Sequence, residues 1–462
     1  MILKSPVKLS AEPRAAIRFE QRVPVQFFHF SWARWAAFVL LGMLLVALRT
    51  PHSWVHQGFY AEDGMVFFQE QIQSGWTVIF RPYAQYLQFM PRLLAVIASM
   101  APVAGQPLIF ALFSAAIQSL AAAFFLLPYN RVLVRSDLLR LGVGLLILID
   151  FPAHEMLNNI MALQWYVIPV AVLILCQMSF SEERFSKGRV IVYSVLMFVI
   201  GLTAPGLIIV LPVAVGVFLF RAKGIEKWVP LSLTIALSVQ GTVFLASPPL
   251  SQSAHGIQES LSPLLLPAIM ATAGSWVYRD VLARSLGVTA AKYLAVHCGE
   301  FLALVLVAVL VTAGIRIAKS WSGKDRVVLM GLGGLSFALI MTSLIVRQLL
   351  KFFGDLTAFT FFDATERYFM VPGSLLLVMA AMLIERKYRW RSEFGPVLIL
   401  FAIFGLGTIG NFQGDELPDK HWAEGAPAIE NWRQQSRHHQ PTPHVSVPIS
   451  PDGWGIDLPE RK

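Results

Sequence analysis

The segment from Trp35 to Leu48, WAAFVLLGMLLVAL, decides the fold class, because it contains no charged residue and approaches the length of a membrane span. It is followed by Phe59-Tyr60-Ala61-Glu62-Asp63-Gly64, which puts two adjacent carboxylates just beyond the first apolar segment. Comparable apolar runs recur along the chain, which is 56% hydrophobic and only 14% charged. Its mean hydropathy is +0.62. Only lipid can hide so much apolar surface, so the composition predicts an all-α polytopic membrane protein.

The apolar runs predict about 11 transmembrane helices, within a range of about 10 to 13. The runs are residues 35–48, 107–127, 138–149, 163–178, 190–200, 207–220, 228–246, 296–317, 327–346, 369–384 and 396–410. Several are shorter than the roughly 20 residues of a straight span, so we expect them to use flanking residues or to be partly re-entrant. Residues 1–30 lack the pattern of a cleavable signal peptide, and the first run is expected to be a permanent anchor.

The orientation follows from lysine and arginine, which accumulate on the cytoplasmic side of membrane proteins. With a cytoplasmic N-terminus and one crossing per run, every short basic loop falls inside. These loops are 131–140, 184–189, 221–227, 319–326 and 386–391. The net charge of +9 therefore reflects membrane topology and does not indicate a nucleic-acid partner. The two cysteines, Cys176 and Cys298, predict neither a disulfide framework nor a thiolate metal site.

This topology predicts three parts of the chain. Residues 1–34 form a basic cytoplasmic tail, residues 35–410 a transmembrane domain, and residues 411–462 a small extracytoplasmic tail of irregular structure or short strands. The first external loop covers about residues 50–105. If all the basic loops lie inside, the apolar stretches 91–105 and 261–282 must each start and end on the outer side or be half of a bent helix. We therefore expect residues 89–100 to form an interfacial helix.

Two interpretations fit the acid pair in the first external loop. Asp63 and Gly64 are typical of a helix start, since aspartate is a good N-cap, and a short helix is expected over residues 63–73. Alternatively, Glu62 and Asp63 are a catalytic acid pair at the membrane surface. The same loop continues with further polar and aromatic residues: Arg81, Tyr83, Tyr86 and Arg92.

Those residue types suit an activated phosphosugar. A carboxylate can act as a base, aromatic rings such as Tyr83 and Tyr86 can stack on a sugar, and Arg81 and Arg92 can bind a phosphate. The competing interpretation is an aromatic belt with anchoring arginines at the membrane interface.

The second external loop contains another polar cluster: His154, Glu155, Asn158 and Asn159. Glu155 could orient an acceptor hydroxyl, and the asparagines could contact a sugar, with Trp165 as a further stacking ring. They could equally be solvated loop residues. The spacing of His154 and Glu155 does not match the zinc-protease helix motif.

Late in the chain, Arg367 and Tyr368 open the run 369–384 from its outer end. The planar guanidinium of arginine is well suited to bind phosphate. An arginine at this depth is also a common interfacial anchor.

In combination these features resemble the GT-C superfamily of membrane glycosyltransferases. The shared pattern is an acidic pair in the first external loop followed by interfacial helices, then an acidic or amide cluster in the second loop, and an Arg-Tyr pair near the end. The segments Ala61–Gly64, Pro82–Leu87 and Pro448–Trp454 look like a bacterial branch of that superfamily. The resemblance covers most of the chain as an architecture, although each motif is short.

The resemblance implies an inverting transfer of a sugar from a polyprenyl-phosphate donor to an extracytoplasmic acceptor: a surface protein such as pilin, or an envelope glycan or lipid. It places the enzyme in a bacterial inner membrane with a periplasmic active site. Asp63 or Glu62 would be the base, Glu155 the second-loop acid, and Arg367 and Tyr368 the donor-phosphate ligands.

The chain departs from the pattern because no second acid accompanies Glu155. A divalent cation on Asp63 and Glu155 is therefore left open, and no cofactor is assigned. The alternative function is a non-enzymatic transporter or flippase of a lipid-linked sugar, which predicts ionisable residues deep within the spans.

Overall fold

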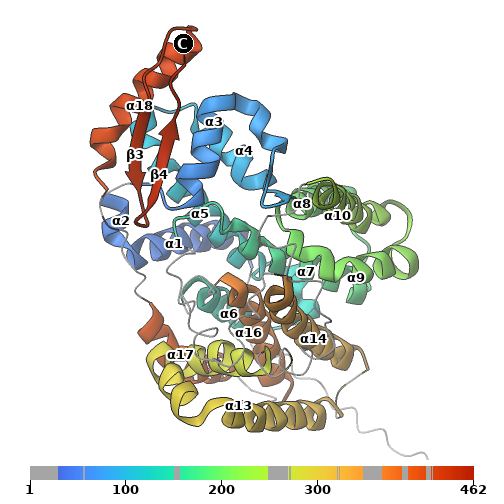
Figure 1. The fold of residues 1–462 in the computed structure, drawn as a ribbon. Coiled ribbons are helices and arrows are strands. Elements are labelled where there is room, and N and C mark those ends of the chain that lie inside the picture. The colour runs from blue at the N-terminus through green and yellow to red at the C-terminus, as the bar shows by residue number, and fades with distance from the viewer. Residues whose placement is uncertain are drawn as a thin grey trace, which may run out of the picture.

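A computed structural model of the chain describes residues 30–55, 58–149, 157–247, 269, 272–319, 321, 323–346, 367–387, 394–412, 418 and 420–461. Most of these residues are helical, and they form a bundle with a smaller unit at one end (Figure 1). We call the smaller unit the cap. It consists of the described residues of 51–105 together with the C-terminal residues from 418 onward.

Apolar helices make up the bundle. They are α1 (Trp32–Arg49), α5 (Gln106–Phe124), α6 (Asp137–Ile149), α7 (Leu163–Phe180), α8 (Lys187–Thr203), α9 (Leu211–Gly216), α10 (Trp228–Ala246), α13 (Val288–Lys319), α14 (Gly323–Val346), α16 (Arg367–Lys387) and α17 (Phe394–Asn411). Short 3-10, π or α turns join them: η4 (Pro128–Val132), η5 (Pro205–Val210), η6 (Val217–Arg221), η7 (Gly224–Lys227), η9 (Trp276–Ala283) and α12 (Arg284–Leu286). Every apolar run predicted from the sequence coincides with helical structure.

Six of these helices are long and apolar enough to cross a membrane, and the number rises to eight if each of two bent pairs is one span. The chain is therefore a predominantly helical, membrane-embedded protein. The larger predicted number also counts short runs such as 138–149 and 396–410, which fall below the ~20 residues of a straight span.

The bent pair formed by α8 and residues 205–221 turns through 119°. At its far end Thr203 Oγ1 accepts a hydrogen bond from the Met90 amide of the cap (3.2 Å). At its near end Glu226 accepts one from the Phe185 amide (2.8 Å) and pairs with Arg184 (3.3 Å). Residues 184–185 and Glu226, which flank the pair, therefore lie side by side. That the two basic loops share one side of a membrane stays a prediction.

The segment 51–105, predicted to be the first external loop, supplies half of the cap. Its elements are α2 (Pro51–Val55), η1 (Asp63–Phe68), α3 (Gln69–Ser74), η2 (Gly75–Phe80), β1 (Pro82–Tyr83), β2 (Tyr86–Leu87), α4 (Phe89–Ala98) and η3 (Val103–Gly105). The helix expected from residue 63 is present as η1 and α3. Helix α4 occupies the predicted interfacial segment and is only 10 residues long.

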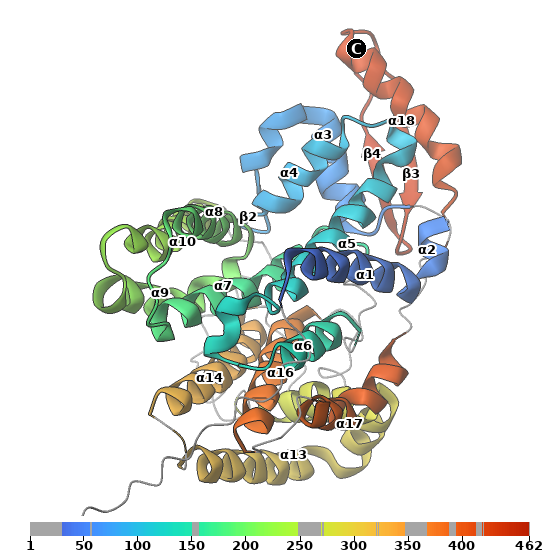
Figure 2. The ribbon, with the colours of Figure 1, turned by 180° about the vertical axis from the view of Figure 1, so that it is seen from behind.

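The C-terminal tail supplies the other half, as helix α18 (Trp422–Arg437) and an antiparallel hairpin of β3 (Val445–Ile449) and β4 (Trp454–Leu458). Short strands were expected here, but α18 was not. The described residues therefore depart from an all-α fold in two small hairpins, β1–β2 and β3–β4. The view from behind shows α1 and α5 directly beneath the cap (Figure 2).

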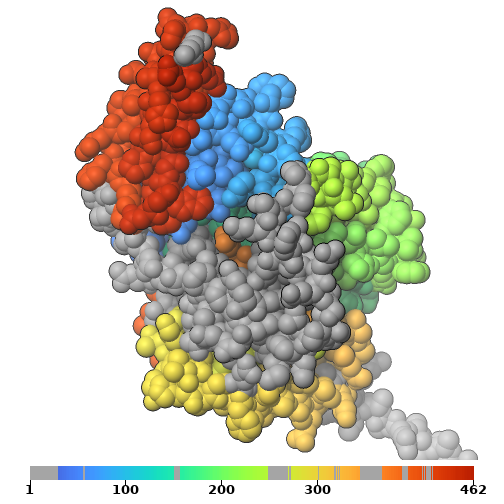
Figure 3. All heavy atoms as spheres, viewed as in Figure 1, coloured from blue at the N-terminus to red at the C-terminus, as the bar shows by residue number. Residues whose placement is uncertain are grey.

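An aromatic cluster joins the two halves of the cap. The ring of Phe59 lies 4.6 Å from that of Phe68, 4.9 Å from Trp422 and 5.0 Å from Phe110 of α5. The C-terminal unit and the first-loop helices consequently present one continuous surface (Figure 3). This packing fixes where the chain places the acid pair.

Candidate functional site

Asp63 begins η1, but its carboxylate does not cap that helix. It accepts hydrogen bonds from the backbone amides of Ile160 (2.9 Å) and Met161 (3.1 Å), which precede α7. The side chain is only 2% exposed. Asp63 thus ties residues 58–68 to the segment before α7. The N-cap interpretation is wrong, because the carboxylate binds Ile160 and Met161 and not an amide of its own helix.

Burial also sets the electrostatics of Asp63. Loss of solvation raises the pKa of its carboxyl well above the usual value, and the neighbouring carboxylate of Glu62 raises it further. The two amide donors oppose this effect without cancelling it. A carboxylate in this environment is held in place and poorly reached by water.

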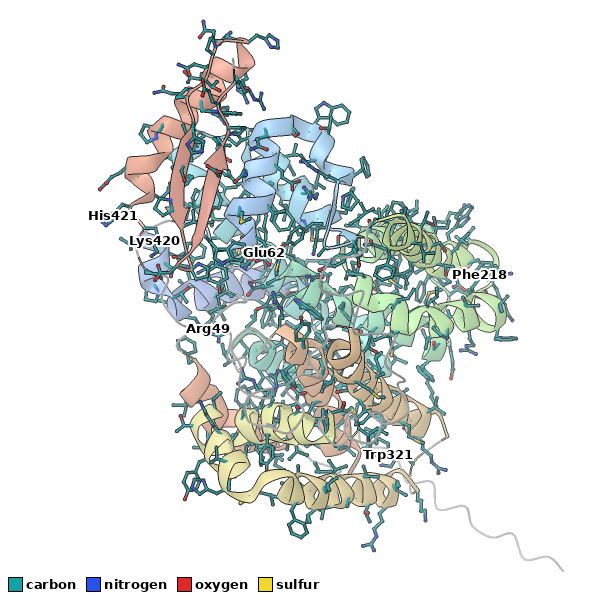
Figure 4. All side chains as sticks on the ribbon, in the orientation of Figure 1. Arg49, Glu62, Phe218, Trp321, Lys420 and His421 are labelled. Carbon is teal, nitrogen blue, oxygen red and sulfur yellow. The ribbon has the colours of Figure 1, made fainter. Side chains whose placement is uncertain are left out.

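Glu62 differs from its neighbour. Its side chain is half-buried, and it makes no hydrogen bond or ion pair with the part of the chain that the structure describes. It lies where the cap meets the bundle (Figure 4). The pair is therefore split into a buried carboxylate bound by two backbone amides, Asp63, and a half-buried one without a hydrogen bond to the described residues, Glu62.

The asparagines of the second loop shape the backbone that holds Asp63. Asn159 is buried, and its side-chain oxygen accepts from the Met161 amide (2.8 Å). Asn158 donates to the Thr50 hydroxyl (2.7 Å) and has a left-handed backbone, with φ of 58°. To contact a sugar, as the sequence suggested, these two side chains would have to give up the hydrogen bonds to Thr50 and to the Met161 amide. His154 and Glu155 lie outside the described residues.

Arg367 and Tyr368, at the start of α16, lie beside the same loop. Arg367 Nη1 is 4.0 Å from the sulfur of Met161. The ring of Tyr368 meets that of Trp165 edge to face, with centroids 5.3 Å apart. The guanidinium carbon of Arg367 is 5.7 Å from the centre of the Tyr368 ring.

Met161 therefore links three predicted site segments. Its amide binds Asp63, its sulfur contacts Arg367, and Trp165 follows one turn later. Residues that are far apart in sequence, around positions 62, 161 and 367, converge at one end of the bundle. The sequence alone could not show this, because the two amides that hold Asp63 belong to Ile160 and Met161, whose side chains carry no such signal.

The other first-loop residues form a second group around Glu70. Arg92 is completely buried, with Nη1 2.9 Å from Glu70 Oε2, and Arg81 Nε is 3.5 Å from the same oxygen. Tyr83 faces Phe67 across 6.3 Å and pairs with Tyr86 across the β1–β2 hairpin. Both arginines thus form ion pairs with Glu70. Among the described residues, no contact joins either of them to Arg367.

Sequence reasoning missed a buried ion pair that contacts α16. Arg284 Nε lies 3.5 Å from Asp280 Oδ1, and Nη2 donates to the carbonyl of Phe369 in α16 (3.3 Å). The close approach requires Gly373, where a Cβ would lie 1.9 Å from Arg284 Nη2. A clue was available in the spacing of Asp280 and Arg284, one helical turn apart in an apolar stretch.

Within the described residues, no three histidine, cysteine, aspartate or glutamate side chains gather as a metal site. Comparisons with protein-family models, curated proteins and solved structures find no match to this chain.

Proposed function

We propose that the chain is a GT-C-type glycosyltransferase that transfers a sugar from a polyprenyl-phosphate donor to an acceptor outside a bacterial inner membrane. The observation that carries the proposal is that Asp63 and Arg367 both contact Met161, that Tyr368 packs on Trp165 beside them, and that Glu62 precedes Asp63 in the chain. These are the residue types that the reaction needs, and they come from three separate parts of the chain.

In the proposed reaction Glu62 takes the proton of the acceptor hydroxyl. The acceptor oxygen then attacks the anomeric carbon, and the bond from that carbon to the phosphate oxygen breaks. Positive charge develops on the sugar ring and negative charge on the departing phosphate. One base and a single displacement imply inversion at the anomeric carbon.

Two side chains would support that displacement. The guanidinium of Arg367 would bind the leaving phosphate through its planar donors. The Trp165 ring, held edge to face against Tyr368, would offer an apolar surface to the sugar. Asp63 would act by fixing the loop that carries Glu62, because its own oxygens are already bonded to amides.

The proposed topology has a cytoplasmic N-terminus, about 11 crossings and the cap on the periplasmic side. The donor would enter from the bilayer. The acceptor, a surface protein such as pilin or an envelope glycan or lipid, would approach beside the cap.

The test uses inner membranes with radiolabelled polyprenyl-phosphate sugars and the resident acceptors. We expect Glu62→Gln to lower transfer by about 100-fold or more, as loss of a general base does. The matched control is Glu424→Gln, an acid with an 81% exposed side chain in the cap, which should transfer at the wild-type rate.

Wild-type transfer by Glu62→Gln would overturn the assignment of the base. If wild-type membranes move labelled lipid across the bilayer without attaching sugar to any acceptor, the chain is a transporter or flippase instead.

A further inference from the structure

The C-terminal hairpin bonds to the backbone immediately before the acid pair. The Ala61 amide donates to the carbonyl of Ser450 (2.6 Å), and the Ser450 amide donates to the carbonyl of Phe59 (3.2 Å). Tyr60 and Ser450 thereby form a parallel bridge. Segments from opposite ends of the sequence meet two residues from Glu62.

The bridged backbone has an unusual conformation. Ala61 has φ of 41°, in the left-handed region that residues other than glycine rarely adopt. Such a conformation persists only where surrounding contacts hold it. Here the bridge with Ser450 supplies those contacts, and the turn at Ala61 sends Asp63 inward and leaves Glu62 half-buried.

The fit next to the bridge is tight. A Cβ on Gly64 would lie 2.6 Å from Ile449 Cδ1 and 2.8 Å from Phe59 Cβ. Further hydrogen bonds hold the C-terminal unit against α3, which follows η1. The Asp457 amide donates to Gln69 Oε1 (2.9 Å), and Arg461 Nη2 donates to the carbonyl of Gln73 (3.3 Å).

We infer that the C-terminal hairpin is the positioning element of the acid pair: the backbone of Ser450 clamps residues 59–61 and so sets the orientation of Glu62. Its catalytic meaning rests on the proposed function, but the clamp itself does not. The hairpin would act without touching substrate, by fixing the left-handed turn at Ala61.

The clamp can be tested without measuring activity. In a chain with Cys176→Ser and Cys298→Ser, Glu62→Cys carries a single thiol whose reaction rate with a membrane-impermeant maleimide reports the exposure of position 62. Ser450→Pro removes the amide that donates to Phe59, and Gly64→Ala pushes against Ile449 from the other side. Gly58→Ala is the control, because a Cβ there meets nothing within 4 Å.

We expect Ser450→Pro and Gly64→Ala each to raise the labelling rate at position 62 by about fivefold or more, since the unfavourable turn at Ala61 would relax. Gly58→Ala should label like its parent. Equal rates in all of these chains, with gel filtration in detergent showing folded protein, would overturn the clamp.

Activity is the second measurement. With Glu62 intact, Ser450→Pro and Gly64→Ala should lower the turnover of sugar transfer by about tenfold, with little change in the KM for the lipid donor. If labelling changes but the wild-type chain transfers no sugar, the clamp stands and the proposed function fails. If wild-type transfer is present and both variants keep its turnover, the clamp does not position the base.

Discussion

Two buried aspartates at opposite ends of the bundle show how differently this chain stabilises a carboxylate. Asp63 and Asp137 are each 2% exposed. Asp63 accepts two backbone amides and stands beside Glu62. Asp137, which precedes the apolar run 138–149, pairs with the guanidinium groups of Arg131 and Arg140.

The difference shows in the direction of the two pKa shifts. Burial raises the pKa of Asp63 well above its usual value, since the amide dipoles do not cancel the desolvation. Burial acts in the same direction on Asp137, yet the two guanidinium groups prevail and its pKa is lowered. A buried aspartate whose charge is balanced by arginines, such as Asp137, is typical of a structural contact. A buried carboxylate with no cation beside it and a half-buried acid next to it, such as Asp63 with Glu62, is typical of a functional site.

The largest expected loss of stability follows from replacing Asp137. Asp137→Ala would leave the buried guanidinium of Arg140 without its carboxylate, which costs about 3–5 kcal/mol of unfolding free energy. Thermal unfolding in detergent, followed by intrinsic fluorescence, measures it against Glu424→Ala as the exposed control. A melting temperature equal to that of the control would show that the pairing of Asp137 with Arg131 and Arg140 does not stabilise the fold.

A smaller loss is expected at the acid pair. Asp63→Asn keeps one acceptor oxygen for the Ile160 amide but turns an amide donor toward the Met161 amide, which then keeps only its bond to Asn159; the loss of one hydrogen bond costs about 0.5–1.5 kcal/mol. Glu62→Gln should leave the melting temperature unchanged, because Glu62 has no partner in the described structure. If Glu62→Gln destabilises the protein as much as Asp63→Asn, the division of roles within the pair is wrong.

The two aspartates should give opposite pH dependences. A raised pKa means that the folded state holds its proton longer, so the stability of wild type relative to Asp63→Asn falls as pH rises above about 4. For Asp137 the folded pKa is lowered, so the stability of wild type relative to Asp137→Asn is present above about pH 4 and lost as pH falls below it. Melting temperatures between about pH 2 and 8 test both signs, since the change expected for Asp137 falls below about pH 4; parallel slopes would contradict the contrast.

The smallest effect is expected at Arg81, whose side chain is 54% exposed and 3.5 Å from Glu70. Solvent screens such a pair, so Arg81→Ala should change the unfolding free energy by less than about 0.5 kcal/mol. The comparison is Arg92→Ala, which removes a fully buried guanidinium from the same carboxylate and should cost clearly more. Equal losses would mean that burial does not separate the two arginines.

Much of the fold could be predicted because it depends on local pattern. Apolar runs marked the helices of the bundle, and Asp63 marked the start of a first-loop helix. Helix α18 was missed although Trp422, Ala426, Ile429 and Trp432 recur at helical spacing and are all buried. The polar residues between them and Pro427 within the helix masked that period.

The sequence by itself determined the membrane class and the residue types of the candidate site, since both depend on composition and on short motifs. Only the tertiary structure decided how those residues divide their work. Asp63 turns inward because two backbone amides 97 and 98 residues away bind it. Glu62 is left half-buried because Ser450, in the C-terminal hairpin, fixes the turn at Ala61. Hydrogen bonds between distant backbone groups leave no mark in a side-chain pattern, so only the fold could reveal them.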